Sequence, residues 1–433
     1  MRYIFSIYNN KIVIKNKHTV LFNSFSGTAI LLKDCIIERW EDLKDQLAIN
    51  DTLFQQLIKA SILVSEDSDE EAALEKRIRD GMLNKDNFIL HINPSLDCNF
   101  SCWYCYENHV PKSKMDASVL TGLFNLISRI LKKSTIKRIE LSFFGGEPLL
   151  YFEEVVKKII LHTSIKCKEY KKMFSVSFTT NGYLLNSCII NWLAQYECGF
   201  QITLDGGRES HNNTRFLKGG LGSYDRIVYN IRELIKRHLY VIVRINYTSK
   251  NIDSVRSILS SFKDLLTDHN EYLSFDFQRV WQERGNEEDD TERKISELRD
   301  LFFKTGGEVR SNYLLHDVRF PCYGDKFNYL LVNYNGDIFK CTARDFSSNN
   351  RVGILMRSGS IKYNRDVMEA RRNSKFFKPI CRKCRIAPLC GGGCTQKSYE
   401  GNDPSTCTLG FTDSDKDNAV IDILDWIITQ KTI

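Results

Sequence analysis

The cysteines are the residues of this chain whose number and spacing point most directly to chemistry. Of the 14, three lie within residues 98–105 and seven within residues 322–407. Thiols stay reduced in an intracellular compartment, so such close spacing there indicates ligands of a metal or an iron–sulfur cluster rather than disulfides. The remaining four lack ligand spacing, and we interpret them as small apolar residues: Cys35, Cys167, Cys188 and Cys198.

The first cysteine group, Cys98, Cys102 and Cys105, forms a C-x3-C-x2-C loop. Three thiolates on so short a loop can bind one metal centre together. If that centre is a four-iron cluster, three protein ligands leave one iron open to a substrate or a cofactor. The spacing alone is also compatible with three buried cysteines or with a zinc site.

A second motif, Gly145-Gly146-Glu147-Pro148, follows an apolar stretch that we expect to be a strand. Glycines accept positive φ and let the backbone approach a ligand closely, and proline fixes the turn. The carboxylate of Glu147 can meet a cationic group. Taken alone such a segment is an ordinary turn, but its place at the end of the strand that follows the cysteine loop favours a binding role.

The elements around these motifs predict an α/β fold. From Phe88 onward, short apolar strands alternate with longer amphipathic helices, which is typical of a parallel sheet. The expected strands are 88–93, 136–144, 173–180, 200–204, 240–247 and 272–280, and the expected helices are 116–133, 151–170, 186–197, 222–238 and 251–265. These six units are too few for a closed eight-stranded barrel but suffice for a partial (β/α)6 barrel. In such a barrel the loops after the strands carry the site.

The cysteine loop and the glycine turn at this separation resemble the radical S-adenosylmethionine (radical SAM) superfamily, over residues 88 to about 280. The resemblance implies that Cys98, Cys102 and Cys105 bind a 4Fe-4S cluster whose open iron is chelated by the amino and carboxylate groups of S-adenosylmethionine (SAM). It also implies cofactor contacts: Gly145, Gly146 and Glu147 at the amino group, Tyr104 near the adenine, and Thr203 and Arg215 at the ribose and carboxylate. The alternatives are an ordinary strand hydroxyl for Thr203 and a surface cation for Arg215.

The C-terminal cysteines carry a second resemblance. C-x2-C pairs in a glycine-rich segment are compatible with zinc, but seven cysteines are too many for one closed four-cysteine site and too few for two. Over residues 322–407 their order and spacing resemble the SPASM domain of peptide-modifying radical SAM enzymes. That resemblance implies two auxiliary 4Fe-4S clusters, and so three clusters in all: the first auxiliary one on Cys322, Cys341 and Cys394, the second on Cys381, Cys384, Cys390 and Cys407. The first auxiliary cluster would then have one iron without a protein thiolate.

The first 80 residues resemble a small winged-helix module. The sequence predicts strands 3–7, 11–14, 18–22 and 62–64, helices 36–47 and 51–60, an acidic linker at 65–71 and a connecting helix at 72–81. With 11 Lys and Arg against 13 Asp and Glu, the module has a net charge of −2 and lacks the basic stripe that DNA binding needs. In many peptide-modifying radical SAM enzymes such a module, the RiPP recognition element, binds the leader of a precursor peptide as an added strand. The alternative is a module that only packs on the barrel.

Length and composition are those of a folded chain with several domains. For 433 residues, 42% of them hydrophobic, we expect a winged-helix-like RiPP recognition element at 1–80, a radical SAM partial barrel at 81–290 and a SPASM domain at 310–433. The sequence has no apolar run near the ~18 residues of a membrane span and no signal-peptide core at its start, so we expect a cytoplasmic protein. We expect neither nucleic acid nor a membrane as a partner.

Together the resemblances imply a radical SAM/SPASM peptide maturase, an enzyme of oxidoreductase type. A 5′-deoxyadenosyl radical would take a hydrogen atom from a ribosomally synthesised precursor peptide, and an auxiliary cluster would accept the second electron as a cross-link forms. A flavodoxin or ferredoxin is the expected electron donor. Two alternatives are formylglycine formation, as in anaerobic sulfatase maturases, and a non-catalytic metal-binding peptide adaptor. The former loses weight because Thr342, rather than an aspartate, follows Cys341.

Overall fold

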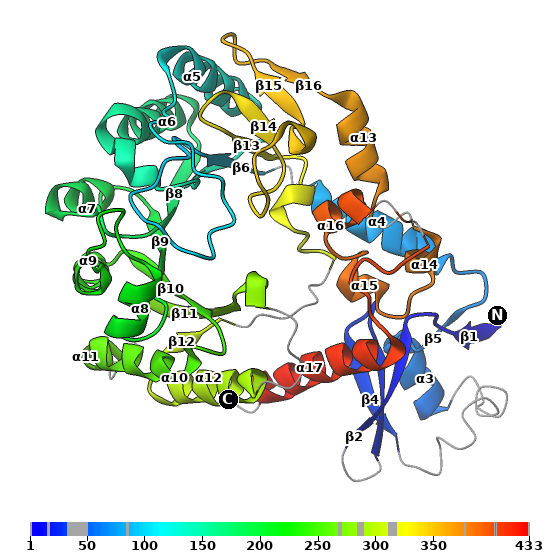
Figure 1. The fold of residues 1–433 in the computed structure, drawn as a ribbon. Coiled ribbons are helices and arrows are strands. Elements are labelled where there is room, and N and C mark those ends of the chain that lie inside the picture. Colours follow the sequence, from blue (N-terminus) through cyan, green and yellow to red (C-terminus); the bar gives the residue numbers. More distant parts are fainter. Residues whose placement is uncertain are drawn as a thin grey trace. The chain divides into compact units, whose positions relative to one another are not determined.

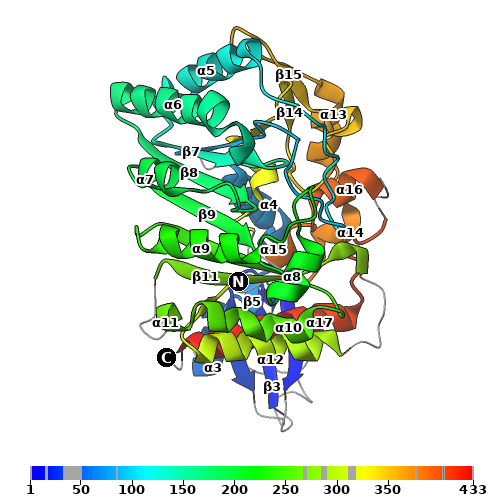
Figure 2. The same ribbon diagram turned by 60° about the vertical axis from the view of Figure 1, so that its left-hand side comes forward.

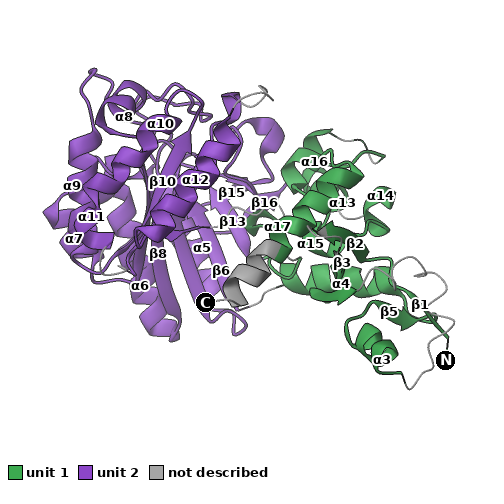
Figure 3. Cartoon of the chain, turned by 90° about the horizontal axis from the view of Figure 1, so that it is seen from below, with its two compact units in different colours: residues 1–84, 313–327, 365–433 green, residues 85–312, 328–364 purple. Residues whose placement is uncertain are grey.

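The structure is a computed structural model, and it describes residues 2–14, 18–32, 51–83, 86–266, 271–283, 290–310, 318–375, 378–401, 403 and 405–431. Its contacts divide the chain into two compact units (Figure 3). Unit 1 comprises residues 1–84, 313–327 and 365–433, and unit 2 comprises residues 85–312 and 328–364. Each unit is therefore assembled from separate stretches of the sequence.

Unit 2 is built on a curved parallel sheet in which neighbouring strands follow one another in the sequence. These strands are β6 (Asn87–Ile92), β7 (Arg138–Phe143), β8 (Met173–Thr180), β9 (Cys198–Thr203), β10 (Tyr240–Tyr247) and β11 (Leu273–Arg279). Helices line the outer side of the curve (Figure 1), and Figure 2 shows the strands side by side behind them. The predicted partial (β/α)6 barrel is confirmed, and every predicted strand agrees with the observed one within two residues at each end.

The helices of unit 2 are α5 (Ala117–Leu131), α6 (Lys157–Tyr170), α7 (Ser187–Leu193), α8 (Arg208–Thr214), α9 (Tyr224–Ile235), α10 (Ile252–Val255), α11 (Lys263–Leu266) and α12 (Thr291–Lys304). The helix predicted at 251–265 is broken, because a 3-10 segment, η3 (Arg256–Ser261), separates α10 from α11. The Ser257 hydroxyl donates to the Ser254 carbonyl, and the Ser260 hydroxyl donates to the Ser257 carbonyl. Such local side-chain bonds compete with a regular helix. The sequence did not predict α8 or α12.

The two faces of the sheet differ in polarity. On β7, Ile139, Leu141 and Phe143 alternate with more polar residues and are fully buried. On β9 and β10, the residues that point to the other face of the sheet include polar side chains, such as Thr203 and its register partner Arg244. The apolar face is covered by helices such as α5, whose buried residues recur with helical spacing. The polar face is thus left for a ligand.

Residues 329–363 extend the same sheet beyond β6. Strand β13 (Tyr329–Val332) pairs with β6 in parallel, and β14 (Asp337–Phe339), β15 (Gly353–Leu355) and β16 (Ile361–Tyr363) continue it antiparallel. At the other edge, β12 (Glu308–Val309) pairs with β11. Part of the segment predicted as the SPASM domain therefore lies in unit 2.

In its described residues, the N-terminal part of unit 1 contains two small sheets and two helices. Strand β1 (Tyr3–Phe5) pairs with β5 (Leu63–Ser65), and an antiparallel sheet is formed by β2 (Asn9–Ile14), β3 (His18–Asn23) and β4 (Thr28–Leu32). The helices are α3 (Thr52–Lys59) and α4 (Glu70–Met82). The sequence did not predict β4, and the helix predicted at 36–47 lies outside the described residues.

The acidic stretch 65–71 is only in part a linker, which corrects the sequence-based prediction. Helix α4 already begins at Glu70, because the Asp69 side chain accepts a hydrogen bond from the Ala72 N–H at 2.9 Å as its N-cap. Glu70 and Glu71 in the first turn complement the helix dipole. Glu70 also accepts the Ile7 N–H at 3.0 Å, which ties α4 to the first strands.

The C-terminal part of unit 1 contributes α13 (Arg365–Asn373), α14 (Pro379–Arg382), α15 (Ala387–Cys390), α16 (Thr395–Gly401) and α17 (Asp413–Lys431). Helix α17 runs across the sheet of β2, β3 and β4 (Figure 1). A buried apolar cluster joins Ile12 and Phe22 of that sheet to Val420 and Leu424 of α17. Within the described part of the chain, we find no helix both long enough and apolar enough to cross a membrane.

Candidate active site

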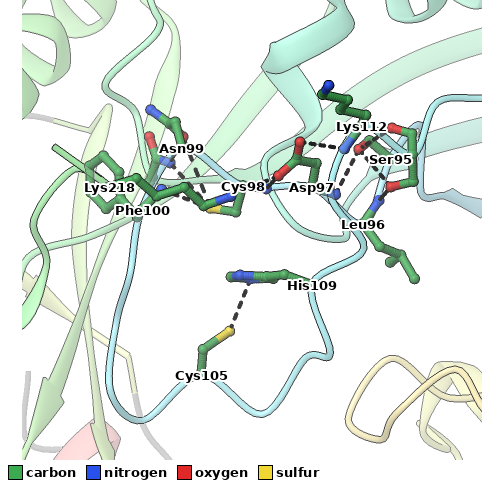
Figure 4. A network of polar contacts seen from close by, with 12 residues as sticks. Ser95, Leu96, Asp97, Cys98, Asn99, Phe100, Cys105, His109, Lys112 and Lys218 are labelled. Atoms are coloured by element: carbon green, nitrogen blue, oxygen red, sulfur yellow. Dashed lines mark hydrogen bonds and ion pairs between the residues drawn. The ribbon is translucent and has the colours of Figure 1, made fainter.

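The loop after β6 brings Cys98 into a fixed position (Figure 4). Asp97 anchors the start of the loop, because its Oδ1 accepts the Cys98 N–H and its Oδ2 accepts the Lys112 N–H, both at 2.8 Å. The Lys218 ammonium pairs with the same carboxylate at 2.9 Å. The Sγ of Cys98 accepts the Phe100 N–H at 3.4 Å. The first thiol is therefore buried and held by the backbone around it.

The other two thiols of the loop are more accessible. Cys102 is half-buried, and Cys105 is exposed, with its Sγ 3.5 Å from Nε2 of His109 (Figure 4). Burial raises the pKa of Cys98 to about 12, so this thiol is protonated at neutral pH. A metal centre binds thiolates, so its assembly here must displace this proton.

The glycine turn lies directly against the cysteine loop. Gly145 and Gly146 have backbone φ angles of +82° and +49°, which residues with a side chain rarely adopt. A Cβ on Gly146 would lie 2.2 Å from the Asp97 carbonyl oxygen, and that same oxygen accepts the Glu147 N–H at 2.8 Å. Gly146 is therefore required by the close approach of two backbones, whereas a Cβ on Gly145 would lie 2.6 Å from Cγ of the Asn93 side chain.

Glu147 is placed differently from its neighbours in the turn. Its carboxylate is fully buried and accepts hydrogen bonds from the Thr180 hydroxyl at 2.6 Å, the Asn181 N–H at 2.8 Å and the Leu149 N–H at 3.0 Å. Burial raises the pKa of this carboxyl, while those hydrogen bonds oppose the rise. In this structure Glu147 therefore fastens the turn to the end of β8.

Tyr104 and Arg215 meet in a buried polar network. The Arg215 guanidinium donates to the Tyr104 hydroxyl oxygen at 2.7 Å, and the Asn246 side-chain amide donates to the same oxygen at 3.1 Å. The Tyr104 hydroxyl in turn donates to Asp205. Arg215 is 8% exposed, so it is not the surface cation of the alternative interpretation.

One cavity of unit 2 collects most of the predicted residues. Its lining includes Cys98, Cys102, Tyr104, Cys105, Gly145, Gly146, Thr203 and Arg215. The elements that supply them are the loops after β6, β7 and β9 and the end of β9 itself. The cavity therefore lies where the carboxyl ends of parallel strands meet, as expected for this kind of barrel.

Several residues of this cavity were not predicted from the sequence. Glu107 is half-buried and accepts the Gly146 N–H at 2.6 Å, and desolvation of its carboxyl raises its pKa to about 7. A lone glutamate in a loop gives no signal of that position. Arg244 and Asn246 also line the cavity. Their signal was present, since two polar residues at a spacing of two interrupt an otherwise apolar strand.

The lining fits an iron–sulfur cluster with a charged cofactor. Three thiols border the cavity beside a guanidinium, and Nε of Arg215 is buried with no hydrogen-bond partner in the described part of the chain. An unpaired buried donor of this kind suits an anionic ligand. Among the described residues, no three His, Cys, Asp or Glu side chains lie close enough together to coordinate one metal ion. The thiols therefore border the cavity without coordination geometry.

The second cavity lies in unit 1 and collects four of the C-terminal cysteines. Its lining includes Cys381, Cys384, Cys390 and Cys407 together with Lys383, Arg385 and Lys416. Burial, and after it the nearby thiolates, raise the pKa of Cys381 and of Cys390 to about 11. Four thiols close enough to influence one another, beside cations, are a donor set that fits a cluster.

Cys322 and Cys394 also lie in unit 1, whereas Cys341 lies in unit 2. Asp325 connects the two segments of unit 1: its N–H donates to the Cys322 carbonyl at 2.9 Å, and its side chain accepts from the hydroxyl of Thr395, the neighbour of Cys394. A buried ion pair with Lys375 holds the Asp325 carboxylate in place.

Comparison with known proteins bears directly on the cavity of unit 2. Residues 92–260 match the model of the Radical SAM superfamily, and that range contains the cysteine loop, the glycine turn and Arg215. The chain therefore contains a radical SAM domain over these residues. The family of that domain implies a 4Fe-4S cluster and SAM as cofactors.

The relatives include enzymes with different named activities. A cysteine-type anaerobic sulfatase-maturating enzyme of Clostridium perfringens is 23% identical over 355 residues, which cover 73% of this chain and 90% of that enzyme. The radical SAM cyclopropyl synthase TigE of Paramaledivibacter caminithermalis is 23% identical over 213 residues, which cover 46% of this chain and 44% of TigE.

Solved structures share the fold at low identity. The structure of anSMEcpe with bound AdoMet superimposes with a TM-score of 0.57 at 18% identity and covers 79% of this chain and 97% of that one. Streptococcus suis SuiB bound to the precursor peptide SuiA superimposes with a TM-score of 0.52 at 13% identity and covers 94% of this chain and 99% of that one. This radical SAM protein therefore shares its fold with both.

Proposed function

We propose that this radical SAM enzyme is a maturase that modifies a ribosomally synthesised precursor peptide. The observation that carries the proposal is the cavity of unit 2, which the thiols of the cysteine loop, the glycine turn and the Tyr104–Arg215 pair line together. A substrate bound in this cavity would lie beside the cluster and SAM, and polar side chains from β9 and β10 would border it.

Cys98, Cys102 and Cys105 would hold the SAM-binding 4Fe-4S cluster. Such a cluster with SAM bound supplies a 5′-deoxyadenosyl radical once it receives one electron. Arg215 offers a buried positive charge to the SAM carboxylate, and Tyr104 orients that guanidinium through its hydroxyl. The Gly145 and Gly146 backbone offers close approach to the amino group. Because the Glu147 carboxylate already accepts hydrogen bonds from Thr180 at the end of β8 and from the Asn181 N–H, we assign it to holding the turn rather than to direct contact with SAM.

The auxiliary clusters are part of the same proposal. The cavity of unit 1 supports a second auxiliary cluster on Cys381, Cys384, Cys390 and Cys407. Cys322, Cys341 and Cys394 would hold the first, with one iron free of protein thiolate. Either cluster would take up the second electron of an oxidative step, and a flavodoxin or ferredoxin would supply the first electron.

The N-terminal sheet supports a peptide as the substrate. Among the described residues, β4 pairs on one side only, with β3. An open strand edge supplies backbone hydrogen bonds to an extended guest, so the leader of a precursor peptide would add here as a further strand. The fold shared with SuiB over 94% of this chain agrees with such a module.

A second candidate is the formation of formylglycine from a cysteine of a target protein. The relationship to the sulfatase-maturating enzyme of Clostridium perfringens favours it. Against it, Thr342 follows Cys341, where that family carries an aspartate as general base. We therefore rank cross-linking of a precursor peptide first.

The first experiment tests the chemistry of the cavity. Cys98→Ala, Cys102→Ala and Cys105→Ala should each abolish 5′-deoxyadenosine production with dithionite under anaerobic conditions, because two thiolates do not hold the cluster at the site of electron transfer. Cys188→Ala, at an exposed cysteine of α7, is the matched control and should retain it. Iron analysis should give about 12 irons per chain. Undiminished cleavage in any of the three variants, or one or two zinc ions in place of iron, would refute the proposal.

The second experiment separates the two candidate reactions. The enzyme is incubated with each short peptide encoded by the reading frames beside its gene, or with a cysteine-bearing sulfatase peptide, and the products are analysed by mass spectrometry. A cross-link removes two hydrogen atoms and keeps any sulfur, whereas formylglycine formation also exchanges the cysteine sulfur for oxygen. Modification of only the sulfatase peptide would overturn our ranking.

A further inference from the structure

The N-terminal sheet of unit 1 packs directly on the segment that carries two of the four cysteines around the unit 1 cavity. Ile12 and Phe22 share a buried cluster with Ile386 and Leu389, and Cys384 and Cys390 pack against that cluster. A recognition module that served only to bind a leader would not need this contact. The sheet therefore packs behind the segment that lines the four-cysteine cavity.

Polar contacts make the connection specific, and they converge on Arg385, the residue after Cys384. Its guanidinium donates to Oδ1 of Asn10 at 2.8 Å, and its carbonyl oxygen accepts from Nδ2 of Asn10 at 3.4 Å. The Ser24 hydroxyl donates to the same carbonyl. Asn10 is fully buried and Ser24 is 3% exposed, so these bonds are shielded from water.

A further contact lies on the other side of Cys384. The Tyr8 hydroxyl oxygen lies 3.3 Å from the Glu70 carbonyl oxygen and 3.5 Å from the Arg382 carbonyl oxygen, and Tyr8 is fully buried in an apolar cluster against which Cys384 packs. The backbone on both sides of this cysteine therefore contacts the sheet or the turn that precedes it. Loss of a buried partner is costly, because the remaining donor or acceptor stays desolvated.

We infer that Asn10 is a positioning residue for the second auxiliary cluster, acting through Arg385. The inference rests on the proposed function, since it requires a cluster on Cys381, Cys384, Cys390 and Cys407. Arg385 lines the cavity, and Asn10 holds its guanidinium there together with Asp417, which pairs with the same guanidinium at 2.8 Å, and the Asp413 carbonyl, which accepts from it at 2.9 Å. A fixed positive charge and fixed peptide dipoles near a cluster favour its reduced state. The module that reads the leader therefore also tunes an electron-transfer centre.

The inference is tested on reconstituted full-length protein by redox titration followed by electron paramagnetic resonance. The signal of the second auxiliary cluster is identified as the one lost or altered in Cys381→Ser. Asn10→Ala should shift the midpoint of that signal to lower potential and leave the other signals unchanged. Arg385→Met should shift it further in the same direction, because it removes the charge itself.

The matched control is Asn9→Ala on the same strand. The Asn9 side chain bonds the Ile62 carbonyl and Asn23 instead of Arg385, so its loss should leave the potential unchanged. A readout without metal is hydrogen exchange of segment 381–390 in the cluster-free chain, which should accelerate in Asn10→Ala and not in Asn9→Ala.

Three outcomes would overturn the inference. The first is an unchanged midpoint in both Asn10→Ala and Arg385→Met at wild-type iron content. The second is an equal shift in Asn9→Ala, which would indicate a general effect of loosening the sheet. The third is equal iron content in wild-type and Cys381→Ser protein with unaltered signals. That result would remove the cluster from the proposed function. It is distinguished from a failure of the inference about Asn10 because it appears before any Asn10 variant is measured. If Asn10→Ala does not fold, Arg385→Lys keeps the charge but loses the planar guanidinium, and it should shift the midpoint less than Arg385→Met.

Discussion

The Arg215 guanidinium donates a hydrogen bond to the Tyr104 hydroxyl oxygen at 2.7 Å, although 111 positions separate the two residues in the sequence. Tyr104 belongs to the cysteine loop, and Arg215 directly follows α8. This bond holds a buried cation beside the thiols of the cavity. The affinity for SAM is therefore expected to depend on both residues, in a graded way.

Arg215→Gln should weaken SAM binding by about 10- to 100-fold, because a hydrogen bond to a charged group contributes about 1.5–3 kcal/mol. Tyr104→Phe keeps the ring and loses only the hydroxyl that orients the guanidinium, so its effect should be several-fold. Equilibrium dialysis with labelled SAM on the reconstituted protein measures both. Wild-type affinity in Arg215→Gln would exclude this residue from the cofactor site.

Gly146→Ala should destabilise unit 2 and weaken SAM binding. The added Cβ would meet the Asp97 carbonyl oxygen at 2.2 Å, and φ of +49° is unfavourable for alanine. We expect a loss of roughly 1–3 kcal/mol, measured as a lower thermal midpoint. Gly219→Ala is the control, since nothing lies within 4 Å of its added Cβ. Equal midpoints for the two variants would contradict the close approach of turn and loop.

Leu31→Asp should weaken binding of the leader peptide and leave SAM cleavage intact. Leu31 lies on β4 with 61% exposure, and covering a leucine contributes about 1.5–3 kcal/mol, so we expect roughly a 10- to 100-fold loss of affinity. Fluorescence anisotropy of a labelled leader measures it. Val13→Asp, on β2 with 67% exposure, is the control. An unchanged affinity in Leu31→Asp would place the leader elsewhere.

The same module is not a good target for deletion. The sequence suggests that a chain without residues 1–80 keeps SAM cleavage, because recognition and chemistry would lie in separate domains. In the structure such a deletion would expose Val420 and Leu424, which pack on Ile12 and Phe22. Point substitutions on the exposed strands therefore separate recognition from stability better than truncation does.

His91 should make the stability of unit 2 depend on pH. Burial lowers its pKa from 6.5 to about 4, so between these pH values the unfolded chain binds a proton that the folded chain does not. The contribution of neutral His91 to the free energy of unfolding is therefore fully present above pH 6.5. It is lost as the pH falls towards 4, and the total change is on the order of 3 kcal/mol. Thermal midpoints between pH 4.5 and 7 should fall less steeply in His91→Gln than in the wild type. Parallel curves would mean that His91 keeps an ordinary pKa.

Local patterns in the sequence were sufficient to predict the strands of the barrel and the thiols of the cysteine loop. The strands from β6 to β11 were predicted because a buried parallel strand needs a short apolar run, which is visible without knowledge of its neighbours. The C-x3-C-x2-C loop and the glycine turn are likewise contiguous motifs. A broken helix at 251–265 escaped prediction because its serines bond their own backbone, a choice that depends on conformation rather than on composition.

The sequence by itself thus determined the class of the fold, the thiols of the cysteine loop and the glycine turn, since each of these depends on residues that are close together in the chain. Only the tertiary structure decided that Arg215 is buried on Tyr104, that Glu147 turns to β8, and that Asn10 meets Arg385 across 375 positions. Such contacts join residues on separate elements, and their energy depends on burial and on the partner that folding brings near. Neither quantity leaves a periodic or contiguous pattern in the sequence.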